Sequence, residues 1–98
     1  MTEQEKKLKE EHGELFKLTV PLGDGEEVLY LRKLDRKTYK AGAKIMESDE
    51  LLGAETFLRG LTIAGDVEKV IEDFDAFRAA SALLAPIITP REGNATRL

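Results

Sequence analysis

The feature that most constrains this 98-residue chain is a pair of alternating apolar and polar runs on either side of a Gly-Asp-Gly turn. In the first run, Phe16, Leu18 and Val20 fall on one side of an extended chain, because successive side chains of a strand point to opposite faces. The second run covers residues 28–31. Pro21 is expected to end the first strand, and the glycines supply positive φ. The pattern therefore predicts an antiparallel hairpin with a loop longer than two residues.

Four segments after the hairpin show the apolar spacing of helices. Their expected caps, in chain order, are Asp35, then Ser48 or Asp49, then Asp66, then Asp73 or Asp75. We expect the first helix over roughly residues 36–47, with Tyr39, Ala43 and Met46 as its apolar stripe. The second should end at Gly65, and the last should kink or stop near Pro86, because proline lacks an amide hydrogen. The sequence predicts an α+β protein, with an N-terminal antiparallel β-hairpin followed by a bundle of three to four short α-helices.

The length suits one domain with one core. Residues 1–13 form a charged helical lead-in, in which Thr2 and Glu5 have the spacing of a capping box and only Leu8 is apolar. Such a helix is expected to be frayed or absent without a partner. Residues 14–88 form the single α+β domain. The polar residues 89–98 are expected to form a flexible C-terminal tail.

Composition excludes several kinds of chemistry. The absence of cysteine excludes disulfides, a thiolate nucleophile and cysteine-ligated zinc. The only histidine, His12, lies among glutamates, and the acidic residues of segment 66–75 do not follow the order of a calcium loop. No apolar run approaches the roughly 18 residues of a membrane span, so we expect a cytoplasmic protein that does not bind membranes. We expect no catalytic, cofactor or metal residues, and thus no enzyme.

The basic segment 32–44 holds six positive charges against Asp35 alone, in a chain whose net charge is −4. Helical spacing places three of these cations on one face, namely Arg36, Lys40 and Lys44. Such a face can bind phosphates or an acidic partner. The alternative is a solvated helix face that balances the acidic third segment of the same chain.

Several short segments between residues 5 and 88 follow one another in a recognisable order. They are Lys9 to Gly13, the strand Glu14 to Val20, the run Tyr30 to Arg36, the pair Ser48-Asp49, and Ala64-Gly65-Asp66 ahead of an acidic stretch and an alanine-rich last helix. In this order they resemble the family of small bacteriophage and prophage tail assembly chaperones. Leu34 departs from the family pattern, which has proline before the Asp-Arg pair.

The resemblance implies a non-enzymatic role in the cytoplasm of the host bacterium. Proteins of this family coat the long tape-measure protein and keep its apolar coiled segments soluble until tail-tube subunits replace them. The implied partners are therefore the tape-measure protein, the tail-tube protein and further copies of the chain. Our candidate contact residues are the apolar Leu51, Leu58, Leu84, Ile87 and Ile88, with Arg36 and Lys40 on a charged rim.

Two other functions stay open at this level. One is a small phage-encoded nucleic-acid-binding or regulatory protein that uses segment 32–44. Its candidates for base stacking are Tyr30 and Tyr39, which both fit core positions, and the net charge is negative, so nucleic acid is not the expected partner. The other is a toxin or anti-defence protein that binds a host enzyme.

Overall fold

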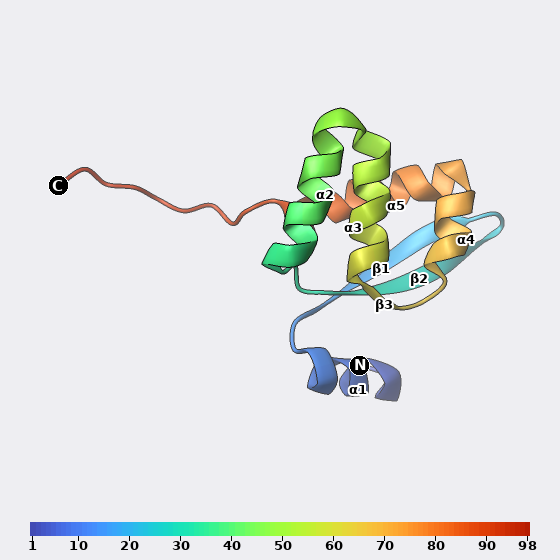
Figure 1. The fold of residues 1–98 in the computed structure, drawn as a ribbon. Coiled ribbons are helices and arrows are strands. Elements are labelled where there is room, and N and C mark those ends of the chain that lie inside the picture. Colours follow the sequence, from blue (N-terminus) through green and yellow to red (C-terminus); the bar gives the residue numbers. More distant parts are fainter.

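The computed structural model describes residues 1–98 and contains one three-stranded antiparallel sheet and five helices (Figure 1). In chain order the elements are α1 (Glu3–His12), β1 (Leu15–Leu22), β2 (Gly25–Arg32), α2 (Arg36–Ser48), α3 (Glu50–Leu61), β3 (Thr62–Ala64), α4 (Val67–Glu72) and α5 (Phe74–Ile88). The α+β class and the N-terminal hairpin are confirmed. The helix count of five differs from the expected three to four, because the lead-in also forms a helix.

The hairpin loop is shorter than the sequence predicts. β1 and β2 pair in register from Leu15 opposite Arg32 to Leu22 opposite Gly25, so only Gly23 and Asp24 connect them. Gly23 has a φ of 59°, a conformation that glycine adopts at low cost. The expectation that Pro21 ends the strand is wrong, because β1 is an edge strand and proline is tolerated on an edge.

The third strand was not expected. We predicted that the helix after Asp49 continues to Gly65, but α3 ends at Leu61 and the chain then forms β3 beside β2. Pairing joins Tyr30 to Ala64 and Leu31 to Thr62, with an irregularity between them. Three residues are too few for a periodic signal, and the strand forms because it satisfies the free edge of β2.

The sheet separates two unequal helical layers (Figure 1). Helices α2 to α5 cover one face, on which Leu18, Val20, Leu29 and Leu31 are buried. The short helix α1 lies on the opposite face, where the Tyr30 hydroxyl donates a hydrogen bond of 3.1 Å to a carboxylate oxygen of Glu5. Successive side chains of β1 therefore point alternately to the helices on one face of the sheet and to α1 on the other.

Helix α1 is better defined than its composition predicts. The expected capping box is present, since the Glu5 amide donates to Thr2 Oγ1 and the Thr2 amide donates to the Glu5 carboxylate. Lys17 Nζ lies 3.3 Å from the same carboxylate. The sequence predicts a frayed or absent helix where a partner is lacking, and in this structure the chain's own sheet is the partner of α1.

The remaining helices begin where the sequence places their caps. Aspartate carboxylates accept the capping hydrogen bonds of all four, at Asp35, Asp49, Asp66 and Asp73. Helix α5 ends at Ile88, two residues after Pro86, as expected for a helix that stops near a proline. No helix combines the length and the apolar character that a membrane crossing requires. Residues 89–98 form no helix or strand and extend away from the domain (Figure 1).

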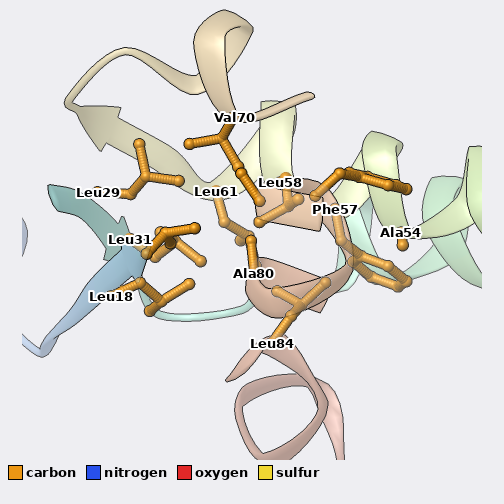
Figure 2. Packing of buried hydrophobic residues seen from close by; sticks show 13 residues of the cluster. Leu18, Leu29, Leu31, Ala54, Phe57, Leu58, Leu61, Val70, Ala80 and Leu84 are labelled. Atoms are coloured by element: carbon orange, nitrogen blue, oxygen red, sulfur yellow. The ribbon is translucent and has the colours of Figure 1, made fainter. Parts of the chain in front are cut away.

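One core of 13 buried apolar residues joins the sheet to the helical layer. Figure 2 shows Leu58, Leu61 and Leu84 pointing into the same space as Leu18 and Leu31 of the sheet. No buried side-chain nitrogen or oxygen lacks a hydrogen-bond partner. Burial of these side chains is the main source of stability, at roughly 1.5–3 kcal/mol for each large one.

Glycines set the distance between α2 and α3. A Cβ on Gly53 would lie 2.6 Å from Met46 Cβ and 2.7 Å from its Cα. A Cβ on Gly42 would lie 2.6 Å from the ring of Phe57. The centre of the buried face of α2 is thus glycine backbone without a side chain. Tyr39, a member of the expected apolar stripe, lies at the flank of the helix and is 49% exposed.

Replacing Gly53 by alanine is expected to lower the free energy of unfolding by about 2 kcal/mol, because the two helix backbones must move apart. The matched control is Gly60→Ala in the same helix, whose Cβ would meet only the end of the Thr38 side chain at 3.0 Å. Alanine has a higher helix propensity than glycine by about 1 kcal/mol, and this gain offsets the close contact at residue 60. Urea denaturation of the two variants measures the difference, and equal midpoints would contradict close packing at Gly53.

Candidate functional site

The structure separates the seven predicted contact residues. Leu58 and Leu84 are 0% and 1% exposed, so their assignment to a partner surface is wrong (Figure 2). Both belong to apolar stripes of their helices, and the sequence does not show which residues of a stripe the core covers. Leu51 is 55% exposed, and Arg36 and Lys40 are exposed as well.

The two isoleucines are half-buried on different sides of α5. Ile87 lies with Phe16 and Leu34 near β1. Ile88 instead lies with Met46 of α2. The predicted residues therefore do not form one continuous surface.

Three neighbouring hollows run along α5 on the side away from Ile87. We call the three hollows together the apolar trough. Leu51 lines both the first and the second hollow, and Met46 and Ile88 line both the second and the third. Residues of α2 and α3 line the wall that faces α5.

The first hollow carries Phe74 and Leu51, the two most exposed large apolar side chains of residues 14–88, together with the exposed Leu52. Leu51, Leu52 and Phe74 are 55%, 46% and 60% exposed and surround it together with Ile71 and Phe77. The guanidinium of Arg78 stands 6.0 Å from the centre of the Phe74 ring. We call Leu51, Leu52 and Phe74 the apolar end patch.

Leu52 and Phe74 were missed by the sequence reasoning. Leu51 and Leu52 are adjacent, so both cannot face the core of one helix. Phe74 directly follows its cap Asp73 and precedes Phe77 by three residues. These two signals were available in the sequence.

The third hollow lies beside the basic face of α2. Tyr39, Ala43 and Met46 line it from α2, Ile88 lines it from the end of α5, and Pro90 lines it from the segment that follows. Its volume is about 460 Å³, and Glu47 is the one charged side chain in its wall. The Tyr39 ring, for which the sequence suggests a core position, lines this hollow.

Five cations of the basic segment have no acidic partner within salt-bridge distance, and we call them the α2 stripe. They are Lys33, Arg36, Lys37, Lys40 and Lys44, all exposed. None of the ion pairs in the structure joins these cations to the acidic segment 66–75.

Arg32, the sixth cation, has a structural position. It donates to Asp35, to Thr38 Oγ1 and to the carbonyl of Gly60, which ties β2 to the start of α2 and the end of α3. Hydrogen bonding from Thr38, with a smaller contribution from Arg32, lowers the pKa of Asp35. The α2 cap therefore stays charged at neutral pH.

The contact between α1 and the sheet should depend on pH. Hydrogen bonding from the Thr2 amide, then from Tyr30, and the nearby Lys17 lower the pKa of Glu5 from 4.5 to about 2. A lowered pKa stabilises the folded state above pH 4.5, and this contribution is lost as the pH falls through about 2. We expect amides of α1 to exchange faster below that range, which NMR hydrogen exchange measures.

Tyr30→Phe supplies the control for this pH dependence. It removes one donor to Glu5 and keeps the ring, so the NMR titration midpoint of the Glu5 carboxyl should rise towards its ordinary value. A midpoint that does not move would show that Tyr30 does not hold α1 in place.

The serine and histidine side chains of the chain have local partners. The two serines donate to helix carbonyls, Ser48 to Ile45 and Ser81 to Phe77. His12 lies beside Glu11 at 3.8 Å. No three acidic or histidine side chains converge in a way that could hold a metal ion. What the surface offers is apolar and cationic contact area.

Comparison with protein-family models, with curated proteins and with solved structures found no match to this chain.

Proposed function

We propose that this chain is a non-enzymatic tail assembly chaperone of a bacteriophage or prophage, which binds the tape-measure protein and keeps it soluble in the host cytoplasm. Two things support the proposal. The first is the resemblance of residues 5–88 to that family. The second, which carries it structurally, is the apolar end patch of Leu51, Leu52 and Phe74 around one hollow.

An exposed patch of this kind suits an apolar helical partner. Large apolar side chains that cluster at a surface mark interaction sites more often than scattered ones do. The patch opens into the trough along α5, and a groove between helices can accept the apolar side of another helix. A partner with long apolar coiled segments would gain solubility by covering those segments with such grooves.

The proposal includes self-association and replacement by tail-tube subunits. Covering a long partner needs many copies of a 98-residue protein. The sheet leaves one side of β1 unpaired, and an unpaired strand edge can pair with another chain. Sedimentation over a range of concentrations tests this part.

Co-expression with the products of neighbouring genes tests the proposal as a whole. The expected result is a soluble complex with a long, coiled-coil-rich protein that is insoluble when expressed alone. Leu51→Ser combined with Phe74→Ser should return that partner to the insoluble fraction, because both substitutions remove apolar contact area from the patch.

The matched control is Leu83→Ser. Leu83, in α5, is an exposed leucine like Leu51, and 43% of its surface is exposed. It lines none of the three hollows of the trough. This variant should keep the partner soluble. Failure to recover any neighbouring gene product would remove the chaperone function, and equal loss in both variants would remove the patch from it.

A further inference from the structure

The α2 stripe and the third hollow form one surface with two kinds of chemistry. Arg36, Lys40 and Lys44 follow one another at four-residue spacing along α2. Tyr39 and Ala43 each stand three residues after one of the first two, on the flank of the helix that lines the hollow. A row of cations therefore runs parallel to a row of apolar side chains.

This surface is positively charged, although the chain as a whole has a net charge of −4. The chain has 15 basic and 19 acidic residues, so the five cations of the stripe leave ten basic against nineteen acidic residues elsewhere. None of the five forms an ion pair within the chain. Charge of one sign that is left unpaired on one face favours a partner of the opposite sign.

We infer that the α2 stripe and the third hollow together bind an acidic amphipathic helix of a partner protein. On a helix, residues four apart are separated by about 6 Å along the axis, which is the spacing of Arg36, Lys40 and Lys44 within the stripe. Carboxylates at four-residue spacing on the partner would therefore meet Arg36, Lys40 and Lys44 in turn. Apolar residues next to those carboxylates would enter the hollow at Tyr39.

A protein segment fits this surface better than a nucleic acid does. A phosphate backbone is met by cations and polar donors. Here the hollow beside the cations is lined mainly by apolar side chains, among them Ala43, Met46 and Ile88, which offer no hydrogen bond. Tyr39 is the only exposed aromatic side chain beside the stripe, whereas single-stranded nucleic acids are bound by successive stacked rings.

Fluorescence anisotropy with a synthetic peptide tests the inference on the full chain. The probe is a labelled peptide of Glu, Leu, Ala and Gln, about 18 residues or five helical turns long, with a leucine stripe flanked by glutamates. Saturable binding is expected, and it should weaken roughly tenfold or more between about 50 and about 500 mM NaCl, because salt screens exposed charges. A peptide of the same composition without the leucine stripe should bind at least roughly tenfold more weakly.

Two double variants with the same change of charge locate the site. Lys40→Glu with Lys44→Glu should weaken peptide binding at least roughly tenfold. The control, Lys6→Glu with Lys7→Glu, alters exposed lysines of α1 on the other side of the sheet and should change it less than roughly threefold. Tyr39→Ala should weaken binding without altering its salt dependence.

Four results would overturn the inference. They are no saturable binding up to about 1 mM peptide, equal loss in the two double variants, tighter binding of a DNA or RNA oligonucleotide than of the peptide, and self-association of the chain through the same lysines. The inference does not depend on the tape-measure assignment, since the probe is synthetic. Failure of the co-expression experiment with intact peptide binding would remove the proposed function alone.

Discussion

Replacing Gly65 by alanine is expected to lower the free energy of unfolding by about 4 kcal/mol. A Cβ at this position would overlap the carbonyl oxygen of Val28 and lie 2.9 Å from Leu29 Cδ2. The carbonyl belongs to the β2 backbone and cannot turn away as a side chain would. The φ of 102° adds strain, because L side chains rarely adopt it. Small domains have only about 5–15 kcal/mol in total, so the variant should be marginally folded.

Two other glycines separate the causes of this loss. Gly23 also has a positive φ, of 59°, but a Cβ there would meet nothing within 4 Å. Gly23→Ala should therefore show the conformational cost alone, about 1 kcal/mol. Gly25→Ala has neither feature and should change stability by less than about 0.5 kcal/mol. Urea denaturation followed by circular dichroism gives all three values, and a Gly65 variant as stable as the Gly23 variant would disprove the close approach of residue 65 to β2.

Replacing Leu84 by alanine should lower the free energy of unfolding by about 3 kcal/mol, within the range of buried leucines. Leu84 is 1% exposed and points into the core beside Leu58 and Ala80 (Figure 2). Its removal leaves a cavity that neighbouring side chains fill only in part. The same substitution at Leu51, which is 55% exposed, should cost less than about 1 kcal/mol.

The contrast between these leucines also distinguishes stability from binding. Thermal unfolding should show a lower midpoint for Leu84→Ala and a nearly unchanged one for Leu51→Ala. Co-expression should show the reverse order for recovery of a partner, provided that the apolar end patch binds it. A stable Leu84→Ala protein would mean that the side chain is not in the core, and the sequence-based assignment of Leu84 to a partner surface would return.

The candidate site was predicted only in part, for reasons that particular residues make clear. Exposure of Arg36 and Lys40 could be predicted, because a helix near the surface keeps its charged side solvated. Leu58 and Leu84 were misassigned because a stripe of apolar residues does not say which part of it a neighbouring element covers. The trough was not predictable at all, since its walls come from α2, α3 and α5 and depend on how these helices cross.

The sequence by itself determined the local structure. Alternation in residues 15–20 and 28–31 determined the hairpin, the capping box of Thr2 and Glu5 the start of α1, and four aspartates the starts of the other helices. These features depend on side chains and backbone groups within a few residues of one another, so spacing along the chain is enough to recognise them.

Only the tertiary structure decided how these elements meet. The free edge of β2 turned Thr62–Ala64 into a strand, the sheet gave α1 a surface to pack on, and the bare backbones at Gly42 and Gly53 allowed α2 and α3 to approach. The same packing placed Leu84 in the core and left Leu51 and Tyr39 exposed. Each of these outcomes depends on contacts between residues far apart in the chain. Burial is therefore a property of the assembled surfaces, which the apolar pattern of one segment does not contain.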